Sequence, residues 1–131
     1  MKKILLDTNA YIAYLRGDKD VLDTLSRVSY VYMSVIVLGE LYAGFQGGKR
    51  KRQNVDILDQ FLSKPSVEVL DVTRETASIF GELKNKLRFA GTPLPINDIW
   101  IASHAVENGA LLLTYEKHFY KIEGIRIWDR I

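Results

Sequence analysis

Four carboxylates occupy positions in this sequence where an acidic side chain is costly, and they are the groups best placed to do chemistry. Asp7 ends a short apolar run near the start of the chain, Asp98 opens a helical segment, and Glu116 lies just past another apolar run. Glu40 is the single charged residue in the stretch 28–48. A carboxylate in an apolar setting must be protonated, hydrogen-bonded, ion-paired or bound to a cation.

Glu40 stands in a helical pattern and shares one face with apolar or small residues at separations of three and four, namely Ile36, Val37, Ala43 and Gly44. If that face is buried, the carboxylate needs a partner. No basic residue lies near enough in the sequence to serve.

Asp98 has a similar setting, because the small residues Ala102 and Ala105 follow it at helical offsets. Small residues let this helix lie close to a sheet, so we expect Asp98 to point over the strand ends. Four acidic groups that converge without a cation would repel one another and raise their pKa values, whereas a divalent metal relieves the repulsion. Oxygen ligands favour Mg²⁺ or Mn²⁺.

Each carboxylate also has a plainer interpretation. Asp7 could merely cap the helix that follows it, and Asp98 or its neighbour Asn97 could cap another. Glu40 could face outward from its helix, and Glu116 could be a solvated loop charge. The joint placement of the four is a stronger signal than any one of them.

The elements that must position these residues alternate between buried strands and helices. Short apolar runs predict strands at residues 3–6, 31–33, 67–70, 110–114 and 125–128. Helical periodicity with capping residues predicts helices at 9–16, 18–28, 35–45, 49–64, 73–90 and 97–108.

This alternation indicates an α/β fold. We expect a single three-layer α/β/α domain over residues 1–131, with a mainly parallel central sheet of about four to five strands. Sites in such sheets form outside the carboxyl ends of the strands. Asp7, Asp98 and Glu116 are therefore expected at the same sheet edge.

Composition excludes several classes of protein. The chain has 131 residues, of which 47% are hydrophobic, and it has no cysteine, which excludes a disulfide scaffold, a thiolate zinc site and a cysteine nucleophile. Its longest apolar stretch, residues 30–39, is far short of the roughly 20 residues that span a bilayer, and no signal-peptide core follows the N-terminus. We expect a cytoplasmic protein with no membrane partner. The net charge of +2 does not by itself indicate a polyanionic partner.

Four short motifs stand in order along the chain: ILLDTNAYIAYL, SVIVLGELYAG, INDIWIASHAVENGA and LLLTYEKHF. With these motifs the sequence resembles the PIN-domain ribonucleases, in particular the VapC-type toxins of bacterial and archaeal toxin–antitoxin pairs. The resemblance covers essentially the whole chain, and it implies a PIN-like fold.

The resemblance implies that Asp7, Glu40 and Asp98 are three core acidic metal ligands. Glu116 stands where these proteins often have a fourth acidic residue, commonly Asp, so its longer side chain could reach the ion through water or stay outside the ligand set. Polar positions beside the ligands, where side chains could orient carboxylates or waters, are occupied by Thr8, Asn9, Asn97 and Thr114.

The implied activity is hydrolysis of RNA phosphodiester bonds that depends on Mg²⁺ or Mn²⁺. One or two ions would activate a water, position the scissile phosphate and stabilise the leaving 3′ oxygen. The resemblance also implies a homodimer and a cognate antitoxin whose C-terminal segment lies over the acidic groove. Two alternatives stay open, a stand-alone RNA-processing nuclease and a PIN-like domain that binds RNA or protein without cutting.

A run of four basic residues, Lys49, Arg50, Lys51 and Arg52, could contact RNA phosphates. Its plainer interpretation is a solvated helix start. Four cations near a helix N-terminus nevertheless oppose the macrodipole, so helix stability does not explain them.

Both histidines, His104 and His118, are interpreted as structural or surface residues, because no metal-ligand spacing accompanies them. Trp100 and Tyr42 could face a partner, but core packing is the favoured interpretation for both. Phosphate-binding loops and dinucleotide-binding folds are excluded, because neither glycine-rich motif is present. A haloacid-dehalogenase-like phosphatase would need Asp where Asn9 stands.

Overall fold

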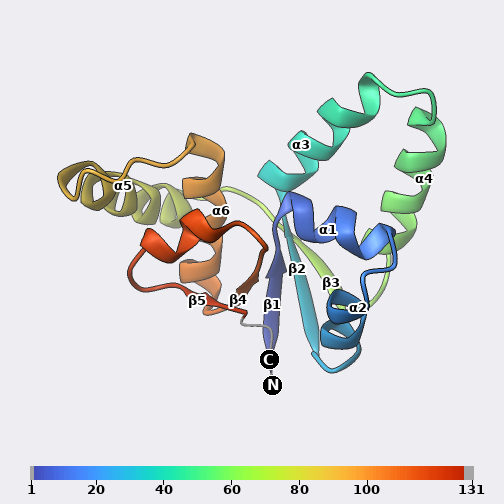
Figure 1. Ribbon diagram of the computed structural model, residues 1–131, viewed down its shortest axis with the longest axis horizontal. Coiled ribbons are helices and arrows are strands. Elements are labelled where there is room, and N and C mark those ends of the chain that lie inside the picture. Colours follow the sequence, from blue (N-terminus) through green and yellow to red (C-terminus); the bar gives the residue numbers. More distant parts are fainter. Residues whose placement is uncertain (1, 129–131) are drawn as a thin grey trace.

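The structure, a computed structural model, describes residues 2–128. Five parallel strands form one sheet in the order β3-β2-β1-β4-β5 (Figure 1). Their bounds are β1 Lys3–Leu6, β2 Tyr30–Ser34, β3 Val67–Leu70, β4 Leu111–Leu113 and β5 Arg126–Ile127. Leu6, the last residue of β1, pairs with Met33 on one side and with Leu113 on the other.

The helices connect these strands in pairs. Their bounds are α1 Thr8–Leu15, α2 Lys19–Ser26, α3 Val35–Gln46, α4 Lys51–Leu62, α5 Arg74–Phe89 and α6 Ile96–Asn108, with a 3₁₀-helix η1 at Lys117–Lys121. The chain moves outward from β1 to β2 and β3, then returns across β1 to β4 and β5. Right-handed crossovers that run in opposite directions place their helices on opposite faces of the sheet. The expected three-layer α/β/α fold with a parallel sheet is confirmed. The expected bounds 1–131 reach beyond the described residues and stay a prediction.

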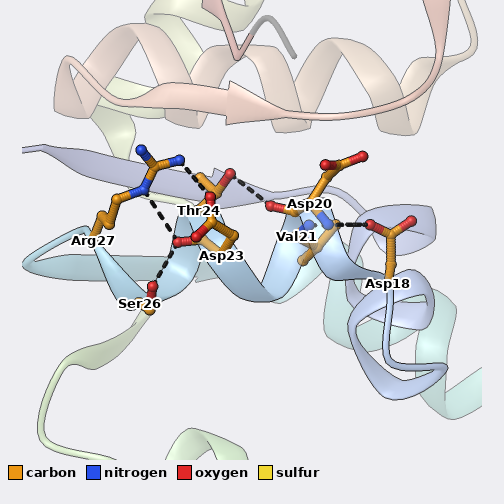
Figure 2. Close-up of polar contacts among 7 residues, drawn as sticks. All are labelled: Asp18, Asp20, Val21, Asp23, Thr24, Ser26 and Arg27. Carbon is orange, nitrogen blue, oxygen red and sulfur yellow. Dashed lines mark hydrogen bonds and ion pairs between the residues drawn. The ribbon is translucent and has the colours of Figure 1, made fainter. Parts of the chain in front are cut away.

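Local capping explains where several helices begin. Asp18 accepts hydrogen bonds from the backbone N–H groups of Asp20 and Val21 and so caps α2, as Figure 2 shows. Ser34 caps α3, and Thr73 caps α5. These three caps were expected from the sequence, because the capping groups belong to the residues that open each helix.

Helix α6 begins differently from the expectation. Pro95 occupies the N-cap position and makes no side-chain hydrogen bond, and Ile96 is the first helical residue. The interpretation of Asp98 or Asn97 as a cap is therefore wrong, because both lie inside the first turn. Their side chains are free to face other elements.

The core lies along the central strands. Ile4, Leu5 and Leu6 of β1 and Leu112 and Leu113 of β4 have no exposed surface. Burial on both faces is what a strand covered by two helical layers requires. Within residues 2–128, none of the helices combines the length and the apolar character that a membrane crossing needs.

Candidate active site

A pocket of about 230 Å³ opens where the carboxyl ends of the central strands meet. It is lined by Asp7, Thr8, Asn9, Glu40, Asp98, Ile101, Glu116 and His118. The structure thus brings all four candidate carboxylates together, although they come from four separate segments of the chain.

The sheet topology explains this convergence. Asp7 follows β1 directly and Glu116 lies three residues beyond the end of β4, the strand that pairs with β1. Glu40 lies on α3, which begins at the end of β2 on the other side of β1. Asp98 lies in the first turn of α6. The chain reverses its direction of travel at β1, and such a switch point is where sites form in open α/β sheets.

Asp7 is buried, with 4% of its surface exposed, and both of its oxygens accept hydrogen bonds. Oδ1 accepts the backbone N–H of Ala10 at 2.8 Å, which caps α1, and Oδ2 accepts the hydroxyl of Thr114. Asp7 therefore caps a helix and also belongs to the site. Burial raises the pKa of Asp7 to about 6, although the hydrogen bonds from Thr114 and Ala10 oppose the rise.

Glu40 is half-buried on α3 and is held by two neutral donors. Its Oε1 accepts the hydroxyl of Thr8, and its Oε2 accepts the amide of Asn97 at 3.3 Å. The expectation of a buried face around Glu40 is only partly right, because Ala43 and Gly44 are exposed. The C-terminal half of α3 leaves the sheet and projects with α4 as a hairpin (Figure 1), and Ala43 and Gly44 lie on its exposed side.

Asp98 is paired with a histidine. Nε2 of His118 lies 2.8 Å from Oδ2 of Asp98, and Nδ1 of His118 lies 3.8 Å from Oε2 of Glu116. Burial raises the pKa of Asp98, His118 opposes the rise, and the charges of Glu40 and Glu116 add to it. The repulsion expected among converging carboxylates is therefore present at this residue.

Glu116 is more exposed than Asp98, with 46% of its side chain accessible against 20% for Asp98. Its Oε1 accepts the amide of Asn9 at 3.0 Å, and its backbone N–H donates to the hydroxyl of Thr114 at 2.9 Å. Glu116 lines the pocket, so it is not merely a solvated loop charge. All four of the polar residues expected beside the ligands thus donate to a carboxylate of the site.

The donor set fits a hard divalent cation. Four carboxylates face one pocket, and among the described residues no lysine or arginine lines it to balance their charge. Within residues 2–128, no three acidic or imidazole groups stand ready around one point to coordinate an ion. Binding of a metal would therefore require the carboxylates to move closer together around the ion, and each oxygen that accepts one hydrogen bond keeps a lone pair for the cation.

The two histidines have different places. His104 is fully buried, with Nδ1 2.9 Å from the hydroxyl of Ser34 and Nε2 3.0 Å from the backbone oxygen of Asp71, which confirms its structural role. His118 lines the pocket and contacts Asp98, a place that its interpretation as a structural or surface residue did not anticipate. The sequence did contain a signal for this position, because His118 follows the candidate ligand Glu116 by only two residues.

Ile101 was also missed, although it follows Asp98 by one helical turn. Trp100 stacks on Phe80 with ring centroids 3.8 Å apart, which confirms packing between α5 and α6. Tyr42 is 37% exposed, so its interpretation as a core residue is wrong; like Ala43, it lies in the part of α3 that projects from the sheet. The four basic residues 49–52 lie outside the pocket, in the turn after α3 and at the start of α4.

Comparison with known proteins agrees with this geometry. A family model described as the PIN domain matches residues 4–125. Ribonuclease VapC2 of Rickettsia felis is 34% identical over 96% of this chain and 98% of its own length. The tRNA(fMet)-specific endonuclease VapC of Salmonella typhimurium is 31% identical over 98% of each chain. The crystal structure of DNA-bound VapBC from Salmonella typhimurium superposes with a TM-score of 0.88 at 30% identity and covers 100% of both chains. The chain therefore belongs to the PIN-domain family and, within it, to the VapC ribonucleases.

Proposed function

We propose that this chain is an endoribonuclease that depends on Mg²⁺ or Mn²⁺ and acts as the toxin of a VapBC-type toxin–antitoxin pair. The observation that carries the proposal is the pocket in which Asp7, Glu40, Asp98 and Glu116 converge without a basic side chain to neutralise them. The relatives named as VapC ribonucleases, matched over almost their whole length, give the same reaction class.

Asp7, Glu40 and Asp98 would hold the metal, and Glu116 would reach it directly or through water. A bound divalent ion lowers the pKa of a coordinated water and stabilises charge that develops on the phosphate. The reaction needs no nucleophile from the protein, which agrees with a chain that has no cysteine.

The neutral donors around the pocket keep the carboxylates ready for this task. Thr114 fixes one oxygen of Asp7, and Thr8 with Asn97 fixes Glu40. Hydroxyl and amide groups orient a carboxylate without cancelling its charge, whereas a lysine at the same place would occupy the site of the cation. These residues therefore position the ligands.

The proposed partners follow from the same relationship. The solved Salmonella typhimurium neighbour is a complex of VapB with VapC bound to DNA. We expect a cognate antitoxin that covers the acidic pocket, an RNA substrate, and a homodimer in the assembled pair. The cytoplasm, where RNA and a newly made antitoxin are both present, is the proposed location.

Cleavage of a mixed, labelled RNA pool by the purified protein tests the proposal. Cutting should require Mg²⁺ or Mn²⁺, stop with EDTA and stop with Asp98→Asn, which keeps the side chain's volume but removes its charge. Cutting that survives in Asp98→Asn would show a contaminant or a different site. Absence of cutting by a folded protein that binds Mn²⁺ in calorimetry would favour the non-catalytic alternative.

Expression in growing cells separates a toxin from a stand-alone RNA-processing nuclease. A toxin should arrest growth when it is produced alone, and coexpression of the protein encoded by the adjacent reading frame should restore growth. Asp98→Asn should be harmless in both settings. Robust growth with the active nuclease alone would contradict the toxin assignment and leave the nuclease assignment standing.

A further inference from the structure

The turn after α3 and the first residues of α4 carry four consecutive cations, Lys49, Arg50, Lys51 and Arg52, and all four are exposed. We call them the basic tip. Figure 1 shows α3 and α4 as a hairpin that projects from the sheet, with this turn at its far end. In the part of the chain that the structure describes, none of the four takes part in an ion pair.

Helix stability does not account for the basic tip. Helix α4 begins at Lys51, the N-cap residue Arg50 makes no side-chain hydrogen bond, and the first turn has no acidic residue. By contrast, α2 and α5 carry Asp20 and Glu75 in their first turns. Cations at a helix N-terminus oppose the macrodipole, and like charges in sequence repel one another. The basic tip therefore weakens the helix that carries it, so a benefit to folding does not explain it.

Helix α3 joins the pocket to the basic tip. Glu40 lines the pocket, and the helix continues for six residues to Gln46, a distance of about 9 Å at about 1.5 Å per residue. Ala43 and Gly44 are exposed on this stretch, and a Cβ added at Gly44 would meet no atom within 4 Å. The stretch of α3 between the pocket and the basic tip therefore includes small, exposed residues.

The electrostatics of the pocket create a need for such a contact. Four carboxylates repel the phosphates of RNA, and no lysine or arginine of the described chain lines the pocket. A polyanion that must be held over an acidic pocket needs cations outside it, and phosphate contacts supply most of the affinity of non-specific nucleic-acid binding.

We infer that the basic tip binds the phosphate backbone of the RNA substrate, beside the segment that is cut in the pocket. This inference rests on the proposed nuclease function. Backbone contacts position a nucleic acid but carry no sequence information. The basic tip should therefore strengthen binding of every RNA that the protein engages, whatever its sequence.

Two variants with the same net charge test the inference. The tip variant combines K49Q, R50Q, K51Q and R52Q. The control variant removes four exposed lysines at the amino end of β1 and on α5, with the changes K2Q, K3Q, K84Q and K86Q. Binding of labelled single-stranded RNA is measured in EDTA by fluorescence anisotropy over a range of KCl concentrations, so cleavage does not interfere.

Removal of phosphate contacts should weaken both the binding and its dependence on salt. Each contact to a single strand contributes about 0.7 to the slope of log affinity against log salt concentration, so two to four lost contacts should reduce the slope by about 1.4 to 2.8. If the two affinities meet at about 1 M salt, this corresponds at about 0.1 M salt to binding that is about 25- to 600-fold weaker. The control variant should match the wild type within about twofold, because it changes only the long-range field, which salt screens. Equal slopes for the tip and control variants would overturn the inference.

Further control experiments show whether a change in binding comes from the lost cations, from misfolding or from a preference for DNA. Thermal melting checks that the tip variant folds, and the pairs K49Q/R50Q and K51Q/R52Q, each expected to give about half of the slope change, replace it if it does not. A slope change seen with duplex DNA but not with RNA would overturn the assignment to RNA. With Mg²⁺ or Mn²⁺, the tip variant should show a raised KM and a retained kcat. Failure of the wild type to cut RNA would contradict the proposed function, whereas cutting by the wild type with no tip-dependent binding would contradict only this inference.

Discussion

Asp7→Asn removes a buried charge from the pocket and keeps the side chain's volume, so it should abolish cleavage and stabilise the fold. Burial raises the pKa of Asp7 from its usual 3.8 to about 6, even though the hydroxyl of Thr114 and the N–H of Ala10 favour the charged form. The difference between these two pKa values corresponds to about 3 kcal/mol of unfolding free energy.

The sign follows from where the proton is held. Folded Asp7 binds its proton more tightly than unfolded Asp7, so its contribution to stability is favourable at low pH and is lost as the pH rises from about 4 to about 6. Asparagine does not titrate. The variant should therefore gain stability relative to the wild type as the pH rises, by about 1 kcal/mol at about pH 4.5 and about 3 kcal/mol at about pH 7.5.

Urea unfolding in EDTA, followed by tryptophan fluorescence at these two pH values, measures the gap between the two proteins. Asparagine caps helices about as well as aspartate, and any change in the contact with Thr114 adds a constant that does not vary with pH. The informative quantity is therefore the change in the gap, about 2 kcal/mol between the two pH values. A gap that stays constant would refute the argument that Asp7 is buried as a destabilising charge.

Other substitutions probe the neighbours of this charge. Thr114→Val removes the hydroxyl that favours ionised Asp7, so it should raise the pKa of Asp7 further and lower the unfolding free energy by about 1–3 kcal/mol. Urea unfolding over a range of pH values measures both effects, and neither would be seen if the hydroxyl does not act on the carboxylate. His118→Gln removes the group that lowers the pKa of Asp98, so NMR titration of that carboxyl in EDTA should report a higher pKa, and a fall would contradict the pairing. His104→Leu removes the ring partner of the buried Ser34 hydroxyl and of the backbone oxygen of Asp71, so it should cost about 1–3 kcal/mol in urea unfolding, with cleavage retained below the melting temperature. Loss of cleavage in the folded variant would contradict a purely structural role.

The sequence was informative wherever the signal is local. Asp18, Ser34 and Thr73 open their helices with side chains that bond to backbone two or three residues ahead, so the residue types and the periodicity that follows predict them. Short apolar runs predicted all five strands within one or two residues at each end. Parallel pairing then sends Asp7 and Glu116 to one edge, which explains why the pocket could be anticipated.

The sequence failed where the outcome depends on a distant segment. Helical spacing shows that Glu40 and Ala43 share a face, but it does not show whether another element covers that face. In the structure α3 leaves the sheet, so Ala43 is exposed while Glu40 is held by Thr8, 32 residues away in the sequence. His118 was undervalued for the same reason, because its contact with Asp98 depends on how η1 packs beside α6.

The placement of charge in this domain separates two tasks that would interfere at one place. Cations within the pocket would pair with Asp7 and Asp98, lower their pKa values and occupy the space that a divalent metal needs. The basic tip lies beyond the end of α3, and the helix alone separates Glu40 from its last residue by about 9 Å. This distance approaches the Debye length of about 10 Å at 0.1 M salt, so the cations leave the carboxylates largely unneutralised. Phosphates that touch the basic tip directly still experience its charge. The projecting hairpin thus allows one small domain to attract a polyanion and to keep an acidic metal site beside it.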